Sequence, residues 1–233
     1  MKISIIIPIS HNYSESERAI ISLVNQTYKN IEILICLNGN SEKYNNRLKK
    51  IFSEYKNIKF YKSKAKNIVD ALNLLIDKAR GEFIARMDCD DVCLPDRIEK
   101  QVDEIKKYKL DFLSTDGEVV NQNMDKIYNH KTNFKKKYFT NPILHPSIII
   151  KRDILKNFKY KHVPYAEDYE LYLRLEKKGI KLNNLQQSLI YYQLNYKNIK
   201  NIKRAFYLIL STLIISKAFR ENLDVNEKFF VNI

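Results

Sequence analysis

The feature of the sequence that most constrains the fold is a regular alternation of short β-rich runs and helical patterns along its first half. Between the apolar runs, apolar residues recur at helical spacing, as in Ile68, Leu72 and Leu75. A succession of this kind predicts an α/β fold with a largely parallel sheet. The predicted strands are residues 3–9, 31–37, 58–61 and 82–87, and the predicted helices are residues 14–26, 41–55 and 68–79.

The length and the absence of export signals indicate one cytoplasmic domain, with or without an appendage. The chain has 233 residues, of which 45% are hydrophobic, enough for one substantial core. No uninterrupted apolar run reaches the roughly 18 residues of a membrane span. The apolar opening lacks a cleavage site, so we read it as a buried strand. Three cysteines without a CxxC pair, Cys36, Cys89 and Cys93, indicate reduced thiols.

The charge balance favours an anionic partner without identifying it. The formal net charge is +14, from 41 Lys and Arg against 27 Asp and Glu. Nucleotides, acidic lipid headgroups and nucleic acid would all suit such a chain. We do not expect nucleic acid, because no RNA- or DNA-binding module is visible. The abundance of Lys, Asn and Ile could also reflect genome composition.

Three carboxylates follow the fourth predicted strand, in the Asp-Cys-Asp-Asp run at 88–91. Ligands of open α/β sheets bind beyond the carboxyl ends of the strands. Like charges this close raise one another's pKa unless a cation neutralises them, and Mg2+ or Mn2+ prefers oxygen ligands. One alternative is that the acids cap a helix beginning around 94–97. A zinc site using Cys89 and Cys93 is a weaker alternative, because no His lies nearby.

In its wider context, this acidic run resembles the DxD region of family 2 glycosyltransferases. The resemblance covers residues 2 to 193, and its motifs occur in the order of that family. The matching segments are residues 3–8, 22–28 (Ser-Leu-Val-Asn-Gln-Thr-Tyr), 71–73, 79–82, 81–97, 145–147 (His-Pro-Ser) and 166–171 (Ala-Glu-Asp-Tyr-Glu-Leu).

The resemblance implies a GT-A fold, with a Rossmann-like nucleotide-binding half at 1–91 and an acceptor-binding half at 92–193. It also implies an inverting transferase that moves a sugar from a nucleotide sugar, usually a UDP-sugar, to a hydroxyl of a glycan or lipid-linked acceptor. Family context points to bacterial surface polysaccharide, lipooligosaccharide or O-antigen synthesis. A nucleotide-binding scaffold that has lost catalysis is the alternative.

The resemblance also assigns catalytic and metal-binding roles to four carboxylates. Asp90 would coordinate a divalent cation, Mn2+ or Mg2+, and Asp88 would approach the ribose or the same ion. Asp168 matches the catalytic base, and Glu167 would position the acceptor or Asp168. From the sequence alone, Glu167 and Asp168 are better explained as acids in the first turn of a helix at 169–178, where the helix dipole favours them.

Donor contacts are implied for a second set of residues, namely Pro8, Ile9, Ser10, Asn38, Lys66 and Asp91. The chain departs from the family pattern at three of these loops. Residues 9–12 (Ile-Ser-His-Asn) stand where the family usually has an aromatic residue followed by Asn. Leu37 stands where the family often has an Asp that contacts the base, although Asn38 can still donate and accept hydrogen bonds. Asn67 stands where the family often has Gly, and Lys66 beside it could reach a phosphate.

His145 could meet the diphosphate, the metal or the acceptor, but a lone His beside a strand is also a common hydrogen-bonded structural residue. Tyr165, Tyr169 and Tyr172 could stack on a sugar ring. Tyr169 and Tyr172 share one helical face, so they fit a core position at least as well.

Beyond residue 193 the sequence changes to a basic amphipathic C-terminal extension, residues 194–233. Lys and Arg residues lead into an apolar segment at 206–215 that is too short to span a bilayer. The extension could bind an anionic membrane surface, which would suit a lipid-linked acceptor on the inner face of the cytoplasmic membrane. It could equally close the catalytic domain or form a homodimer interface.

Overall fold

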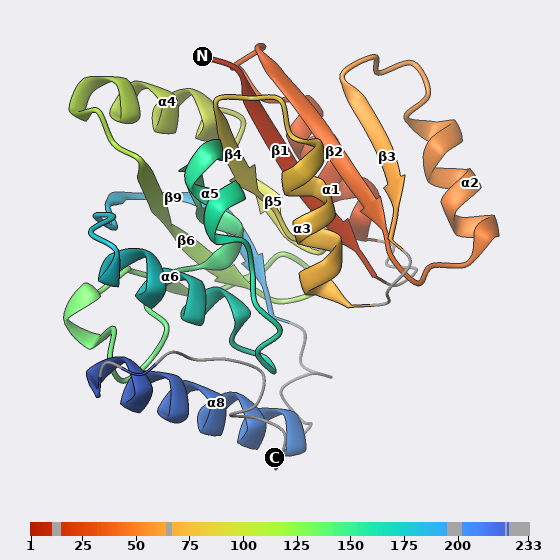
Figure 1. The fold of residues 1–233 in the computed structure, drawn as a ribbon. Helices are drawn as coiled ribbons and strands as arrows, with labels where there is room; N and C mark the ends of the chain where they lie inside the picture. Colours follow the sequence, from red (N-terminus) through yellow and green to blue (C-terminus); the bar gives the residue numbers. More distant parts are fainter. Residues whose placement is uncertain (11–14, 64–66, 195–201, 222, 224–233) are drawn as a thin grey trace.

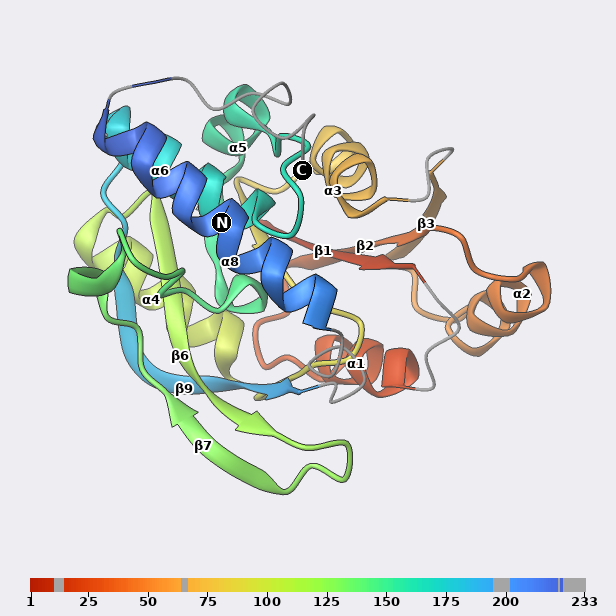
Figure 2. The same ribbon diagram turned by 90° about the horizontal axis from the view of Figure 1, so that it is seen from below.

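The computed structural model describes residues 1–10, 15–63, 67–194, 202–221 and 223. They form a curved mixed sheet with helices packed on both faces (Figure 1). Figure 2 shows α1 and α2 on one side of the first strands and α3 on the other. The α/β fold class predicted from the sequence is therefore confirmed.

The first half of the chain builds a parallel sheet, in the strand order β3-β2-β1-β4. Helices connect consecutive strands, as the alternating pattern predicts. The strands are β1 (Ile3–Ile9), β2 (Ile31–Leu37), β3 (Ile58–Lys62) and β4 (Phe83–Arg86), and the helices are α1 (Glu15–Val24), α2 (Glu42–Ile51) and α3 (Ile68–Lys78).

The central strands are mostly apolar because helices cover both of their faces. β1 and β2 are buried along their whole length. In β1, Ile5 and Ile7 belong to one hydrophobic cluster and Ile6 to the other. α2 ends earlier than the predicted helix 41–55, because the chain turns at Phe52 and buries that side chain in the core.

The second half continues the same sheet with strands of mixed direction. β8 pairs antiparallel with both β4 and β6, while β9 runs parallel to β6 and antiparallel to β5. β6 and β7 form an antiparallel pair that projects from the body (Figure 2). These elements are β5 (Val92–Cys93), α4 (Arg97–Tyr108), β6 (Phe112–Val120), β7 (Lys126–His130), η1 (Phe134–Lys136), η2 (His145–Ser147), β8 (Ile149–Lys151), α5 (Arg152–Phe158), α6 (Glu167–Lys177) and β9 (Asn184–Gln193).

The C-terminal helix α8 (Ile202–Arg220) packs along α6 (Figure 1). Ile215 and Ala218 are buried in a small cluster with Tyr169 and Leu173 of α6. Apolar side chains also lie on the opposite, solvent-facing side of α8, so the helix does not divide into one apolar and one polar face. Among the described residues, no helix combines the length and apolarity needed to cross a membrane.

We expect Ile215→Ala to lower the free energy of unfolding by roughly 2–5 kcal/mol, because it leaves a cavity between α6 and α8. Ile215 is fully buried, whereas Leu213 on the same helix is exposed. The control, Leu213→Ala, should cost well under about 1 kcal/mol. Urea unfolding measures both. Equal small effects would show that α8 does not pack on the domain in solution.

Candidate active site

The loops predicted to carry chemistry meet at one edge of the sheet. β1, β2 and β4 are parallel, so their carboxyl ends lie side by side. The N–H of Asn38, directly after β2, donates to the carbonyl oxygen of Ile9 at the end of β1, at 2.8 Å. The acidic turn 88–91 follows β4 at the same edge. This edge is the topological position at which open α/β sheets bind ligands.

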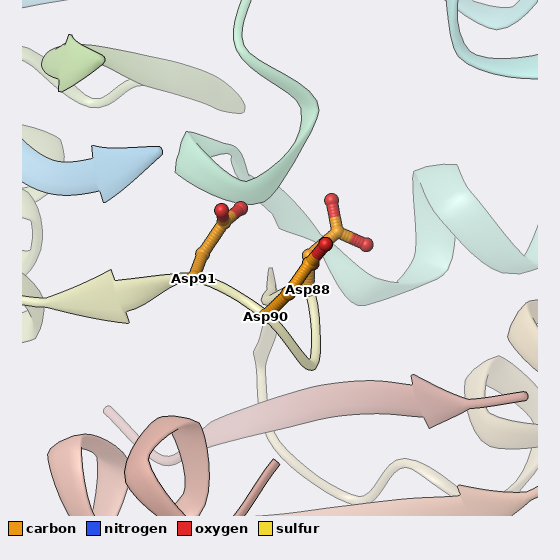
Figure 3. A group of neighbouring side chains, drawn as sticks. All are labelled: Asp88, Asp90 and Asp91. Carbon is orange, nitrogen blue, oxygen red and sulfur yellow. The ribbon is translucent and has the colours of Figure 1, made fainter. Parts of the chain in front are cut away.

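The three carboxylates of the acidic turn form a compact oxygen cluster. Asp88, Asp90 and Asp91 each offer an oxygen, and these oxygens lie within 4.8 Å of one another. All three side chains project from the same side of the turn (Figure 3). Burial, and then the charge of Asp88, raise the pKa of Asp90 to about 6. The same causes, with the charge of Asp90, raise the pKa of Asp91 well above its ordinary value.

The acidic turn does not cap a helix, so that alternative is wrong. The short strand β5 separates the turn from α4, which begins at Arg97. The residue before α4, Asp96, makes no side-chain capping hydrogen bond. The clustering of 88–91 therefore has no explanation in the helix dipole.

Two residues of the family-like motifs hold this turn in place. Gln26, after α1, donates from Nε2 to the carbonyl oxygen of Leu94 at 2.8 Å and accepts from the N–H of Ile98 at 3.0 Å. Arg97 is fully buried and donates from Nη2 to the carbonyl oxygen of Arg86 at 3.0 Å. These hydrogen bonds fix the backbone on both sides of the acidic turn.

Arg86 is a site residue that the sequence reasoning missed. Its side chain is almost fully buried and its Nη1 forms an ion pair with an Asp88 carboxylate oxygen. Its charge also opposes the rise in the pKa of two carboxylates, Asp90 in the adjacent acidic turn and Asp168 on the distant helix α6. The available signal was a permanent cation at the end of an otherwise apolar strand.

Glu167 and Asp168 open helix α6 and are brought close to the acidic turn. Asp168 Oδ2 accepts from Asn141 Nδ2 at 2.7 Å, and its Oδ1 accepts from the N–H of Tyr169 at 2.7 Å. Burial raises the pKa of Asp168 above its ordinary value, although these two hydrogen bonds and the Arg86 charge oppose the rise. Burial and the charge of Asp168 raise the pKa of Glu167 to about 7. Both acids do lie in the first helical turn, as the alternative interpretation expects.

We expect Glu167→Gln to stabilise the metal-free protein above pH 7. Because the folded-state pKa of about 7 exceeds the ordinary value of 4.5, the folded state retains a proton between these pH values that the unfolded state loses. The free energy of unfolding therefore falls as pH rises through this window, by on the order of 1–3 kcal/mol. The variant should lack the Glu167 part of this fall, whereas exposed Glu54→Gln should keep the whole of it. Urea unfolding between pH 4 and 8 gives the free energy of unfolding of each variant as a function of pH. Parallel curves for Glu167→Gln and wild type would contradict the raised pKa of Glu167.

His145 is buried in the described structure and has a structural partner. Its Nε2 lies 2.8 Å from the hydroxyl oxygen of Tyr160. Burial, with the nearby Arg86 charge, keeps the pKa of His145 well below its ordinary value, so the ring is neutral at pH 7. Asn73 in turn holds the backbone of Tyr160 through two hydrogen bonds of 3.0 Å. A neutral His145 offers a phosphate no charge, so its predicted donor or acceptor contact would be a hydrogen bond.

The tyrosines suggested as stacking platforms separate into two kinds. Tyr169 and Tyr172 are buried, in different hydrophobic clusters, so they belong to the core. Tyr165 is exposed, with a positive φ of 60°.

The predicted donor-binding residues are partly placed. Pro8 and Ile9 are buried at the end of β1, and Ser10 is half-buried. Asn38 Nδ2 donates to the Asn67 carbonyl oxygen at 2.7 Å, while its buried Oδ1 has no partner among the described residues. Lys66 lies outside the described residues.

Asp91, also predicted to contact the donor, is buried. Its Oδ1 accepts from the Gln193 N–H at 2.8 Å, and its Oδ2 has no partner in the described part of the chain. Asp91 therefore links the acidic turn to the end of β9.

The cysteines do not form a zinc site within the described structure. Cys89 and Cys93 are both buried, and Cys93 Sγ accepts from Gln26 Nε2 at 3.2 Å. The aspartates at 88, 90 and 91 are the one group of three or more ligand-type residues close enough for a metal among the residues described. Burial raises the pKa of both thiols.

A parallel sheet with an acidic turn at its carboxyl edge, and a second acid pair nearby, is the arrangement of a GT-A glycosyltransferase. The sequence profile of glycosyl transferase family 2 matches residues 4–169. The chain belongs to this family. The family and the GT-A fold expected from the motifs are thus confirmed.

Curated relatives cover most of the chain. The O-antigen biosynthesis glycosyltransferase WbnJ of Escherichia coli is 33% identical over 215 residues, covering 88% of this chain and 84% of its own. The UDP-Glc:alpha-D-GlcNAc-diphosphoundecaprenol beta-1,3-glucosyltransferase WfgD of Escherichia coli is 28% identical over 179 residues, covering 75% of this chain and 70% of its own.

Solved structures share the fold at low sequence identity. The mannosyltransferase PcManGT from Pyrobaculum calidifontis, in complex with GDP-Man and Mn2+, superimposes with a TM-score of 0.74 at 14% identity, covering 100% of this chain and 67% of that one. TarS of S. aureus in complex with UDP-GlcNAc superimposes with a TM-score of 0.73 at 16% identity, covering 98% of this chain and 69% of that one.

Proposed function

We propose that the protein transfers a sugar, with inversion, from a nucleotide sugar to a hydroxyl of a lipid-linked glycan during surface polysaccharide or O-antigen assembly. The observation that carries the proposal is the convergence of two acid groups from distant segments. Burial and the charge of Asp168 chiefly raise the pKa of Glu167 on α6, and Asp88 in the acidic turn lies near enough that its charge adds to the rise. Such a pair of groups can serve the leaving diphosphate and the attacking hydroxyl separately.

The acidic turn fits a divalent cation. Its oxygens are clustered, and the pKa values of Asp90 and Asp91 are raised first by burial and then by the neighbouring carboxylate charges, so protein groups alone do not stabilise the ionised cluster. A Mn2+ or Mg2+ ion held by Asp90 and Asp88 would supply Lewis-acid stabilisation of the negative charge on the leaving diphosphate. The Arg86 contact occupies one Asp88 oxygen, which leaves the other available.

Asp168 is the proposed general base. It accepts the proton of the acceptor hydroxyl while the bond from that oxygen to the anomeric carbon forms and the bond to the diphosphate oxygen breaks. Its raised pKa brings it closer to neutral pH, where a base of this kind is most effective. Asn141 and the Tyr169 N–H hold both carboxylate oxygens, so the group is already oriented. Glu167 is proposed to position the acceptor or Asp168.

The relatives support the acceptor class. WbnJ is named for O-antigen biosynthesis, and the name of WfgD specifies a UDP-glucose donor and a diphosphoundecaprenol-linked sugar as acceptor. By similarity, we propose a nucleotide-sugar donor, most simply a UDP-sugar, and an acceptor carried on a lipid diphosphate. An inner-face location at the cytoplasmic membrane follows from this acceptor.

A donor screen tests the proposal. The full chain is incubated with UDP-, GDP- and dTDP-sugars, with Mn2+ or with chelator, and release of the nucleoside diphosphate is measured. We expect Mn2+-dependent release from one nucleotide class. Donor binding without release or transfer to any acceptor would instead favour the non-catalytic scaffold.

A further inference from the structure

The segment 134–139 reads Phe-Lys-Lys-Lys-Tyr-Phe and is named the basic-aromatic loop below. It includes η1 and the turn that follows it. The Phe139 side chain is 75% exposed and Tyr138 is 39% exposed, while Lys135 and Lys136 are also at the surface. No role in the proposed chemistry requires these side chains.

The backbone of the basic-aromatic loop is held firmly by its neighbours, although its side chains face solvent. The Tyr169 hydroxyl on α6 donates to the Lys137 carbonyl oxygen at 2.5 Å. The Ser216 hydroxyl on α8 donates to the Tyr138 carbonyl oxygen. Lys137 Nζ forms an ion pair with Glu176 of α6 at 2.5 Å. The exposure of Phe139 is therefore a feature of an anchored loop.

The outer face of α8 extends this surface. Ile209 and Leu213 are 60% and 55% exposed. Ser216, seven residues after Ile209 and so on the same side of the helix, is buried where it contacts the basic-aromatic loop. Two basic residues of the last turn, Lys217 and Arg220, are also exposed on α8. Exposed apolar and cationic side chains are thus present on both the loop and the helix.

An anionic lipid bilayer matches this combination. Aromatic side chains prefer the interfacial region of a membrane, and clustered Lys residues are attracted to anionic headgroups. The exposed aliphatic side chains Ile209 and Leu213 suit acyl chains better than nucleic-acid bases. A symmetric second copy would bring the Lys residues of two such loops together, which charge repulsion opposes.

The basic-aromatic loop also lies next to the proposed base. Asn141, two residues beyond the loop, donates from Nδ2 to Asp168 Oδ2 at 2.7 Å. From this position and these side chains, we infer that the basic-aromatic loop and the outer face of α8 dock on an anionic membrane surface, so that a lipid-linked acceptor reaches Asp168 from the bilayer. Membrane docking does not depend on the proposed function, whereas the delivery of an acceptor to Asp168 rests on it.

Vesicle binding tests the docking surface with the full-length chain. Sedimentation with phosphatidylglycerol-containing vesicles should show salt-sensitive binding, and neutral phosphatidylcholine vesicles should bind far less. The pair Lys135→Glu with Lys136→Glu should weaken binding roughly tenfold or more. The matched pair Lys49→Glu with Lys50→Glu, on the exposed side of α2, changes the net charge equally and should have little effect. Equal losses in the two pairs would overturn the assignment of the surface.

A fluorescence reporter provides a second measurement, because the chain contains no Trp. Phe139→Trp places a single indole in the basic-aromatic loop, and its emission should shift to shorter wavelength when anionic vesicles are added. Tyr108→Trp, at a side chain that is 54% exposed on α4, serves as the control and should not shift. An unshifted emission from the Phe139→Trp variant, or binding of its indole to single-stranded RNA or a second copy in place of vesicles, would refute membrane docking.

Donor turnover separates this inference from the proposed function. The Lys135 and Lys136 double variant should keep wild-type donor turnover in solution and lose transfer to an acceptor embedded in vesicles. If wild type binds vesicles but turns over no donor, the proposed function fails while docking stands. If the double variant transfers to the embedded acceptor as well as wild type, delivery from the membrane is wrong.

Discussion

Asp168→Asn is expected to lower the turnover number roughly 10²- to 10⁴-fold, the contribution of a positioned general base. The amide cannot accept a proton from the acceptor hydroxyl, yet its size is unchanged. Its oxygen can still accept from the Tyr169 N–H, as Asp168 does at 2.7 Å. Steady-state kinetics should therefore show a loss in kcat, while calorimetry should show donor binding in Mn2+ within a fewfold of wild type.

The helix-dipole interpretation of Asp168 predicts a different outcome, and Asp153→Asn is the matched control. Asp153 is also an acid in the first turn of a helix, α5, but it is exposed at the surface. If Asp168 only stabilises α6, both substitutions should cost a few tenths of a kcal/mol in stability and leave turnover intact. Full activity of Asp168→Asn would remove the base assignment.

Most of the fold could be predicted from the sequence because the central strands are covered on both faces. Such strands are continuous apolar runs, as in Ile5, Ile6 and Ile7, and their helical connections have a regular apolar spacing. The acidic turn could also be predicted, since its position after an apolar strand places it at the ligand-binding edge of the sheet.

The long-range contacts that complete the site could not be predicted, because the spacing of apolar and polar residues within one segment does not indicate which distant segment it will contact. Arg86 pairs with a near neighbour, but its influence on Asp168 exists only once the fold brings α6 near the end of β4. The contact between Asp91 and the Gln193 N–H joins segments 102 residues apart. The sequence of α8, apolar on more than one side, did not indicate which side would meet α6.

Asp90→Asn should remove metal-dependent donor binding and lower kcat/KM by about 100-fold or more, because the proposed cation loses a charged ligand. The same substitution should stabilise the protein in chelator at pH 8, by on the order of 1–2 kcal/mol. The reason is that burial and the neighbouring Asp88 charge raise the pKa of Asp90 to about 6, so ionised Asp90 destabilises the metal-free fold above that pH.

The two expected effects of Asp90→Asn, lower activity and higher stability of the metal-free protein, distinguish loss of a metal ligand from misfolding. Loss of activity through misfolding would lower stability, whereas removal of a functional ligand should lower activity and raise the stability of the metal-free protein. Thermal unfolding with and without Mn2+ and nucleoside diphosphate supplies the second readout, since ligands that bind the folded state raise the melting temperature of wild type. The variant should show little such rise.

Asp103→Asn, on the exposed face of α4, should behave as wild type in both assays. An Asp90→Asn protein that is less stable in chelator, or equally stabilised by Mn2+, would show that the acidic turn is not the metal site.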